Sequence, residues 1–536
     1  MTPLGAWADS LWFDAQNAPR PVARQAVQRL SAAREDGLLP SDYAAETLAQ
    51  LVRNAGTRPL QAAEVPAADG QLTRQVEHYL HDLHAGRVNP RTLGARYSSA
   101  DGAVPFDASA VLRDALQAQN LDQAWRAATP RTPMYDDLHA ALRRYLRLER
   151  GSLWKRSAGA DGQVVTDAEG SASMPVAPQR KANKKHPAAQ TTAGSSLAEQ
   201  RLVALGDLSA ADLEGSSASG KKAFQAGVRS FQQRHGLAAT GVLDAATRAQ
   251  LEVPPSSRAE QIALTMERMR WTPVLKGRRS IVVNVPEFYL RAYDNASGQA
   301  EEKLGMRVIV GKSLDTRTPL FDEDMRYIEF SPYWNVPPSI ERKELVPHLR
   351  RDPGYLKRGG FEIVTAGGGV TTSASAGVLN AVLAGKARIR QRPGPKNALG
   401  DVKFVFPNNS NIYLHHTSSP GLFSRTRRDL SHGCIRVEEP VQLAEFVLQD
   451  DPAWTEERIR KAMDRGQPTT ARLKEPLPVV ITYNTAVVRD GKVYFLGDLY
   501  GQDRVLAQAL SHQGTAGKAP KSAKALQKND SPRKGR

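Results

Sequence analysis

The chain of 536 residues contains one cysteine, Cys434, and no long apolar run. A single cysteine excludes an intramolecular disulfide, so its thiol is either buried or kept for chemistry. No segment reaches the roughly eighteen consecutive apolar residues that a membrane-spanning helix needs. The N-terminus, MTPLGAWADSLWF, has neither a basic start nor an apolar stretch, so no signal peptide is visible in the sequence.

Acidic residues are fewer than basic ones: the chain has 56 Asp and Glu and 73 Lys and Arg, which gives a formal net charge of +17. Much of the excess lies in polar segments at 179–194 and beyond residue 512, which we interpret as solvated basic segments. No aromatic and basic groove or base-reading module accompanies the charge. We therefore predict no nucleic-acid partner, although the charge would suit an anionic cell envelope.

The pattern of apolar residues changes along the chain. Spacing of three and four residues, as at Val22, Ala26 and Leu30, predicts helices over the first 150 residues. Residues 157–195 are mostly Ala, Gly, Ser, Pro and Lys, a composition typical of a flexible insertion. Short alternating segments begin at Arg279 and indicate strands, and Asp490-Gly491 predicts a hairpin turn.

The sequence thus predicts a multi-domain α+β protein, in which a helical scaffold and a small three-helix module are attached to a β-rich catalytic domain. A helical or loop-like capping insertion interrupts this domain. The predicted boundaries are 1–156 for the scaffold, 157–195 for a disordered insertion, 196–254 for the small module, 255–278 for a connecting helix, 279–450 for the catalytic domain with its insertion at about 334–400, 451–510 for a helix and strands completing the scaffold, and 511–536 for a disordered basic tail.

The residues with chemical potential concentrate between Ile412 and Pro440. A thiol is a useful nucleophile only as a thiolate, so Cys434 needs a nearby base, and His415, His416 and His432 are close in sequence. Gly433 would let the backbone bend so that the amides of Gly433 and Cys434 point at one spot and form an oxyanion hole. Zinc would want a fourth ligand and no second cysteine exists, so we expect neither a metal nor a cofactor.

Two blocks of this chain resemble cell-wall proteins. The segment with GVRSFQQRHGL and TGVLDAATRAQL resembles the small peptidoglycan-binding domain. His415, followed by fifteen residues and then Ser-His-Gly-Cys, resembles the signature of the L,D-transpeptidase (YkuD-type) catalytic domain, and WNVPPSIERKELVP and RQRPGPKNALGDVKFVFPN resemble its large multi-domain periplasmic members. This resemblance implies that His415 is the general base, that Cys434 forms a thioester, and that Ser431, His432, Gly433 and Arg436 shape the site.

One position departs from this pattern, because the subgroup usually has Asp after the base, within LHDT, whereas this chain has His416. The change is tolerable if the backbone carbonyl of residue 416 orients the base, and we then expect His416→Asp to retain activity. His416 remains an alternative base, because only one of two successive strand residues can face Cys434. The candidate substrate-binding residues are His416, Tyr413, Trp334 and Asn397, although aromatic residues in strands usually belong to the core.

The resemblance implies a transpeptidase that attacks stem peptides of peptidoglycan and forms 3→3 cross-links in the periplasm, with other wall-synthesis enzymes as candidate partners. A carboxypeptidase or hydrolase, and an enzyme that attaches a protein to the wall, would share the same thioester. A non-catalytic wall-binding protein is the alternative from a different class. The positive charge of the capping insertion further predicts a lid that attracts the carboxylates of stem peptides.

Overall fold

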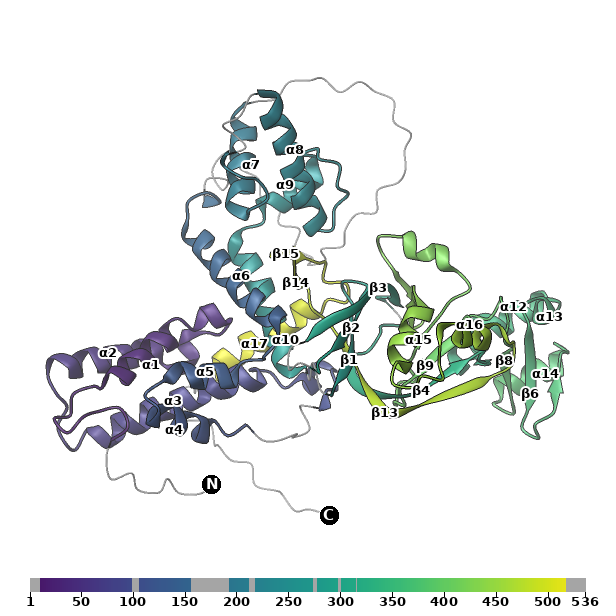
Figure 1. The fold of residues 1–536 in the computed structure, drawn as a ribbon, viewed down its shortest axis with the longest axis horizontal. Coiled ribbons are helices and arrows are strands. Elements are labelled where there is room, and N and C mark those ends of the chain that lie inside the picture. The colour runs from purple at the N-terminus through teal and green to yellow at the C-terminus, as the bar shows by residue number, and fades with distance from the viewer. Residues whose placement is uncertain are drawn as a thin grey trace, which may run out of the picture.

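The computed structural model describes residues 10–98, 106–155, 192–211, 217–272, 277–296, 300–314 and 316–516. Helices dominate the first half of the chain and strands the second, and Figure 1 shows the helical scaffold at one end of the long axis and the capping insertion at the other. Residues 156–191 and 517–536, which contain most of the two segments predicted to be disordered, lie outside the described residues. None of the helices among the described residues is long and apolar enough to cross a membrane.

The first five scaffold helices pack around one apolar core, and the sixth contributes to a second core. The scaffold helices are α1 (Pro21–Ser31), α2 (Ala45–Thr57), α3 (Val65–Ala85), α4 (Ala108–Gln117), α5 (Leu121–Ala128) and α6 (Pro133–Arg150). Pro21 and Pro133 stand in the first turn of their helices, where a missing N–H costs nothing. Asp107 and Thr132 cap α4 and α6 by accepting hydrogen bonds from backbone amides of the first turn. Leu30, Leu72 and Leu80 are fully buried where these helices meet.

The small three-helix module consists of α7 (Thr192–Leu205), α8 (Ser217–Arg234) and α9 (Ala245–Glu252). Its core contains Leu202, Val228 and Phe231, each at 0% exposure. The buried Gln232 amide bonds Thr247 and the carbonyl of Val242, which holds the turn between α8 and α9. Helix α7 begins four residues before the predicted start of the module.

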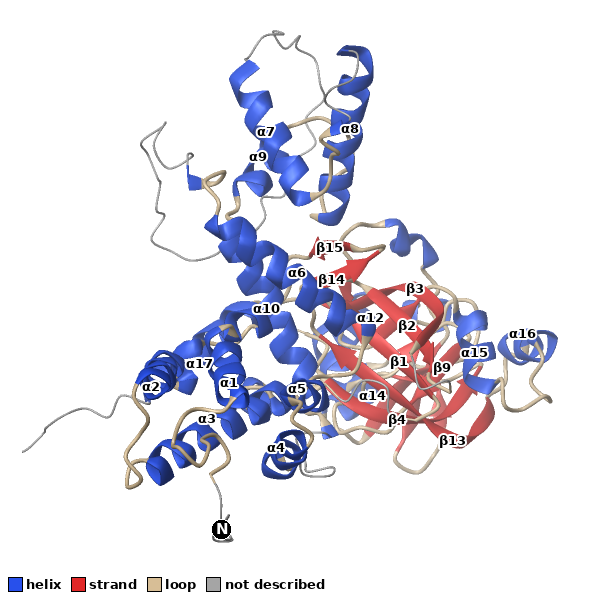
Figure 2. Cartoon of the chain, turned by 60° about the vertical axis from the view of Figure 1, so that its left-hand side comes forward, coloured by secondary structure: helices blue, strands red, loops and turns tan. Residues whose placement is uncertain are grey.

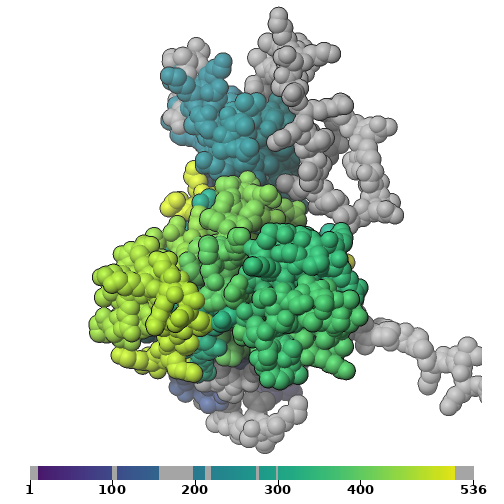
Figure 3. Space-filling view, turned by 90° about the vertical axis from the view of Figure 1, so that its right-hand side faces the viewer, coloured from purple at the N-terminus to yellow at the C-terminus, as the bar shows by residue number. Residues whose placement is uncertain are grey.

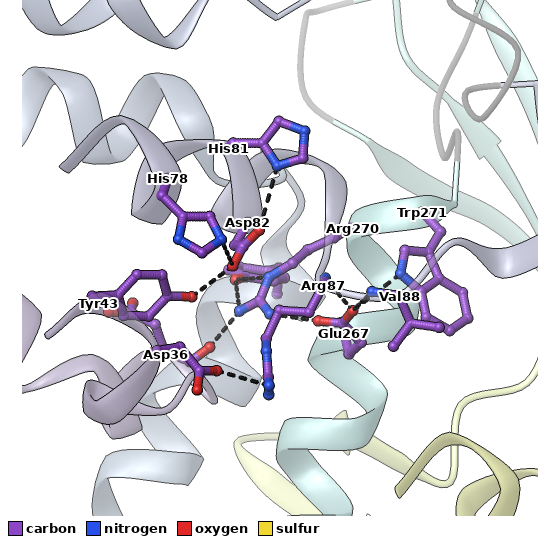
Figure 4. Close-up of polar contacts among 12 residues, drawn as sticks. Asp36, Tyr43, His78, His81, Asp82, Arg87, Val88, Glu267, Arg270 and Trp271 are labelled. Atoms are coloured by element: carbon purple, nitrogen blue, oxygen red, sulfur yellow. Dashed lines mark hydrogen bonds and ion pairs between the residues drawn. The ribbon is translucent and has the colours of Figure 1, made fainter. Parts of the chain in front are cut away.

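A dense polar junction joins the scaffold to α10 (Pro255–Trp271), the predicted connecting helix (Figure 4). The Glu267 carboxylate accepts hydrogen bonds from the amides of Arg87 at 2.5 Å and Val88 at 3.0 Å, and from the Trp271 indole at 3.3 Å. Arg270 donates to Glu267 at 3.0 Å and to the Tyr135 hydroxyl at 3.1 Å. The scaffold is therefore joined to α10 by buried hydrogen bonds as well as by the connecting chain.

Nine strands form the main sheet, in the order β11-β3-β12-β10-β9-β4-β13-β1-β2. The strands are β1 (Arg279–Asn284), β2 (Tyr289–Asp294), β3 (Glu301–Gly311), β4 (Phe321–Phe330), β9 (Val402–Val405), β10 (Leu414–His415), β11 (Asp429–Ser431), β12 (Ile435–Val437) and β13 (Thr469–Thr482). Because β3 also pairs with β2, the sheet closes on itself. Helices α15 (Pro440–Leu448) and α16 (Glu456–Asp464) cover one side and α10 the opposite side (Figure 2).

The capping insertion, which we call the cap, is a small subdomain with its own core and a four-stranded sheet in the order β5-β8-β6-β7. Its elements are β5 (Trp334–Asn335), α11 (Pro338–Ile340), the π-helical turn η7 (Glu341–Leu345), α12 (Val346–Arg351), α13 (Tyr355–Arg358), β6 (Phe361–Thr365), β7 (Val370–Thr371), α14 (Ala376–Leu383) and β8 (Ala387–Gln391). The prediction of a helical or loop-like insertion missed this sheet. Figure 3 shows the cap as a lobe beside that of α16 and β13.

The segment 451–510 does not act as one unit, in contrast to the prediction that it completes the scaffold. Helix α16 packs in the core of the nine-stranded sheet, and β13 lies between β4 and β1 in that sheet. The hairpin β14 (Ala486–Arg489) and β15 (Lys492–Phe495) packs against α6 and α10, and α17 (Gln502–Ala516) and Val480 of β13 pack against α10. Helix α17 continues past residue 510, where the basic tail was predicted to begin.

Candidate active site

The candidate catalytic residues lie on two adjacent parallel strands, β10 and β12. Leu414 pairs with Ile435 and His415 with Arg436, and Cys434 immediately precedes β12. Leu414 and Ile435 point into the core at 0% exposure, so the alternate positions share the opposite face. The side chains on this second face are those of Tyr413, His415, Cys434 and Arg436.

The His415 imidazole is held by a backbone carbonyl. Its Nδ1 lies 2.5 Å from the carbonyl oxygen of His416, and the residue is 4% exposed. Burial, followed by the charge of Arg436, lowers the pKa of the His415 imidazole to about 3. The ring is therefore neutral at physiological pH. A second backbone carbonyl, that of Leu399, also contacts the ring. With the proton on Nδ1 facing the carbonyl of His416, Nε2 is the nitrogen that can accept a proton.

The His416 side chain takes a different direction. Its Nδ1 lies 2.7 Å from Oδ1 of Asp401. Because successive side chains of a strand point to opposite faces, only the ring of His415 lies on the face of Cys434. Residue 416 contacts this ring through its backbone carbonyl. A histidine was expected to be tolerable at position 416 if the backbone carbonyl of this residue orients the base, and that carbonyl contacts His415.

The thiol of Cys434 is half-buried and hydrogen-bonded. It donates to the carbonyl of Asn411 at 3.6 Å and accepts hydrogen bonds from the backbone amide and the hydroxyl of Tyr413. Burial raises the pKa of the Cys434 thiol, and the two donors of Tyr413 only partly oppose this rise. The resting thiol is therefore protonated, and attack on a carbonyl requires a base to remove its proton.

The loop before Cys434 is fixed by hydroxyl groups. Ser431 Oγ donates to the carbonyl of Cys434 at 2.6 Å and accepts from the amide of Gly433 at 3.1 Å. Thr316 and Thr318 donate to the carbonyls of Ser431 and Gly433. Gly433 has a φ of +117°, a conformation that other residues rarely adopt.

This geometry corrects the predicted oxyanion hole, because the Gly433 amide already donates to Ser431. The Cys434 amide has no hydrogen-bond partner within the described part of the chain. Of the two amides named from the sequence, only that of Cys434 is therefore an available donor to an oxyanion in this conformation.

Arg436 lies beside His415 on the same face. Its Nε is buried and finds no hydrogen-bond partner among the described residues. Burial lowers the pKa of the Arg436 guanidinium, which nevertheless remains a cation. A half-buried cation with an unused donor next to a candidate base is suited to an anionic group of a substrate.

Two cap residues reach the candidate active site. Glu344 of η7 lies 2.7 Å from Nε2 of His432, the residue two positions before Cys434. Trp334 of β5 is hydrogen-bonded to the Tyr413 hydroxyl, which itself contacts the Cys434 thiol. The cap therefore contacts both the catalytic loop and the strand that carries the base.

Asn397, which the sequence suggested as a substrate-binding residue, is buried and bonded within the protein. It is 1% exposed, and its side chain donates to the carbonyls of Pro332 and Arg392 and accepts from the amide of Leu399. These bonds close the end of the cap onto its start. We therefore assign Asn397 to the support of the cap.

Sequence analysis did not identify Asp401, Glu344, Thr316 and Thr318 as parts of the site. Each contacts a site residue that is distant in the chain, at separations of 15, 88, 115 and 115 residues, so no local pattern marks them. Among the described residues, no group of three or more His, Cys, Asp or Glu side chains could hold a metal ion.

Comparison with known proteins matches three segments of this chain to three families. Residues 278–468 match the L,D-transpeptidase catalytic domain, residues 8–142 match the Scaffold domain, and residues 193–251 match the "Putative peptidoglycan binding domain". A Haemophilus influenzae protein named "Putative L,D-transpeptidase" is 33% identical over 249 residues, which cover 46% of this chain and 49% of that protein. The chain thus spans about half the length of this curated relative. Residues 278–468 of this chain therefore form a catalytic domain of the L,D-transpeptidase family, which a Scaffold domain and a peptidoglycan-binding domain accompany.

Proposed function

We propose that this protein is a peptidoglycan L,D-transpeptidase that uses Cys434 as nucleophile and His415 as general base. The observation that supports this proposal best is their arrangement: both lie on one face of adjacent parallel strands, and a backbone carbonyl holds Nδ1 of His415 at 2.5 Å. The family match of residues 278–468 and the peptidoglycan-binding domain support the substrate class.

In the first half-reaction Nε2 of His415 accepts the thiol proton while Cys434 Sγ attacks the carbonyl of an L-centre in a tetrapeptide stem. The oxyanion receives a hydrogen bond from the Cys434 amide. When the tetrahedral intermediate collapses, its C–N bond breaks, His415 returns the proton to the departing amine, and terminal D-alanine leaves. The product is a thioester on Cys434.

In the second half-reaction an amine of a second stem attacks the thioester. His415 removes a proton from this amine, the C–S bond of the thioester breaks as a new amide bond forms as the 3→3 cross-link, and His415 returns the proton to the departing thiolate. Water or a protein amine would complete the same cycle as hydrolysis or wall attachment. A substrate in the cell wall places the enzyme outside the cytoplasm, in the periplasm.

The cap acts as a lid in this proposal. Its contacts with His432 and Tyr413 connect it to the catalytic loop, and it carries exposed cations that would attract stem carboxylates. The exposed cations are Arg342, Lys343, Arg350, Arg351, Lys357, Arg358, Lys386, Arg388, Arg392 and Lys396. Closure would exclude the water that hydrolyses a thioester.

Mass analysis of muropeptides tests the proposed function. The purified protein is incubated with tetrapeptide-containing disaccharides, and separately with a carbapenem, a β-lactam that acylates enzymes of this family. We expect a 3→3 cross-linked dimer, and a carbapenem adduct on the peptide that contains Cys434. Hydrolysed product without dimer would favour the carboxypeptidase, and absence of both products and of the adduct would favour a wall-binding protein.

A deletion tests the lid. Replacement of residues 334–396 by a short Gly-Ser link retains the loop that precedes β9, and circular dichroism checks that the variant folds. We expect slower acylation by stem peptide and a larger share of hydrolysed product than for the full chain. Unchanged acylation and an unchanged ratio of dimer to hydrolysed product would show that the cap is not a lid.

A further inference from the structure

The carbonyl of His416 fixes which nitrogen of His415 carries the proton. Because Nδ1 donates to this carbonyl at 2.5 Å, Nε2 is left as the proton acceptor. The orientation of the base therefore depends on how firmly residue 416 is held. A peptide group at the end of a two-residue strand has few ladder hydrogen bonds to fix it.

Three contacts hold residue 416, and all come from the segment 400–402. The His416 amide donates to the carbonyl of Val402 at 3.0 Å, and its ring Nδ1 meets Asp401 at 2.7 Å. Gly400, with a φ of +65°, packs so closely that a Cβ there would lie 2.8 Å from His416 Cβ and Nδ1. The contacts of Asp401 and Gly400 are with the side chain of His416, which takes no part in the proton transfer.

Asp401 is itself attached to a rigid part of the domain. Its carbonyl accepts from the amide of Ser331 at 2.7 Å, and Ser331 is 2% exposed. The Ser331 hydroxyl contacts the carbonyls of Ala462 and Met463 in α16 at 3.1 and 2.8 Å. Asp401 thus connects the ring of His416, through its carboxylate, to the end of β4 and to α16, through its backbone carbonyl.

We propose that Asp401 and His416 form a positioning pair for the catalytic base. The pair fixes the backbone carbonyl of residue 416 against Nδ1 of His415, and thereby selects the tautomer that leaves Nε2 free for the thiol proton. This inference rests on the proposed function. It assigns no chemical step to either side chain of the pair.

The pair also changes the expectation for His416→Asp. This substitution restores the residue usual in the subgroup, but in this chain it would place two carboxylates against each other. Repulsion would push residue 416 away from Asp401, and the carbonyl would follow. We now expect His416→Asp alone to be impaired, in contrast to the expectation from the sequence.

The exchange Asp401→His/His416→Asp is the informative rescue, because it restores an imidazole–carboxylate pair with its members reversed. The rate constant of Cys434 acylation by a carbapenem is measured for the wild type, Asp401→Asn, His416→Asp and the exchange. We expect each single variant to lose about 10-fold to 100-fold in the maximal rate constant with little change in half-saturation, and the exchange to recover most of it.

Glu456→Gln serves as the matched control, because Glu456 forms an ion pair of the same length, 2.7 Å, with Arg460 on α16 of the same domain. Exposed pairs such as Glu456–Arg460 contribute little to stability, so this control should unfold near the wild-type temperature, and thermal unfolding checks that the other variants are folded. Equal acylation rates for the wild type and both single variants would overturn the positioning pair. Absence of acylation in the wild type would instead refute the proposed function.

A spectroscopic measurement tests the pair independently of activity. Long-range proton–nitrogen correlation of protein labelled with ¹⁵N-histidine reports the tautomer of each ring, and His415→Gln assigns the His415 signal. We expect the wild type to hold the proton on Nδ1 of His415 and Asp401→Asn to show a mixture of tautomers. An identical single tautomer in both proteins would contradict the proposal.

Discussion

The junction between the scaffold and α10 is buried and the face that carries Cys434 is half-buried; both are polar, but they use their polar atoms differently. At the junction the Glu267 carboxylate accepts from two amides, an indole and a guanidinium. At the active site the Cys434 thiol remains protonated, and Arg436 Nε has no partner within the described ranges. Polar groups that are fully hydrogen-bonded within the protein stabilise the fold, whereas a donor without a protein partner is available to bind a ligand.

The largest expected effect is on chemistry at Cys434. Cys434→Ala and Cys434→Ser should lower thioester formation on the order of 10⁴-fold or more, because no other described thiol exists to replace the nucleophile. The thiol is only half-buried, so the unfolding temperature should stay near that of the wild type. Mass spectrometry of the carbapenem adduct and thermal unfolding measure the two quantities. Wild-type acylation by Cys434→Ala would refute this mechanism.

The next effect separates the two histidines. His415→Ala removes the proton acceptor and should slow acylation by about 10²- to 10⁴-fold. His416→Ala retains the backbone carbonyl that contacts Nδ1 of His415, so its loss should be nearer 10-fold. Stopped-flow acylation under saturating carbapenem compares them. A slower His416→Ala than His415→Ala would identify His416 as the base.

At the junction the expected effect is on stability. Glu267→Ala leaves Arg270, which is 5% exposed, without its carboxylate, and should lower the free energy of unfolding by about 3–5 kcal/mol. Acylation per folded molecule should not change, because the junction lies away from the catalytic face. Glu260→Ala on the exposed side of the same helix is the control, with an expected change below about 0.5 kcal/mol. Similar urea midpoints for the two variants would show that the junction does not stabilise the fold.

A further expected effect concerns pH. The pKa of His415 is about 3 in the folded state and ordinarily about 6.5 in an unfolded chain, so the unfolded state takes up this proton first. Stability should therefore decrease as the pH falls from about 6.5 toward 3. Acylation should persist below pH 6, because the base stays neutral. An acid limb near pH 6.5 that disappears in His415→Gln would contradict this expectation.

The sequence predicted the elements that carry a local signal. The Asp490-Gly491 hairpin is confirmed, with φ values of +48° and +68° at its two turn residues. The strands after Arg279 and the connecting helix are confirmed as well. His415 and Cys434 followed from a spacing that resembles a known signature, and the structure brings them to one face.

Other features left no readable signal. Strands β5 and β7 have two residues each, too few to show alternation, so the cap sheet was missed. In β13 the register shifts between Arg472 and Leu477, which breaks the alternation of buried residues. The Asp401–His416 contact depends on the meeting of β9 and β10, which single-residue patterns cannot predict.

The position of β13 has a practical consequence for dividing this protein. The family match of the catalytic domain ends at residue 468, one residue before β13, yet this strand pairs with both β4 and β1. A chain cut at 468 would leave β1 and β4 each without the strand that pairs with it, and would expose their edges as open, aggregation-prone edges of the sheet. An excised catalytic unit should therefore extend at least through Thr482.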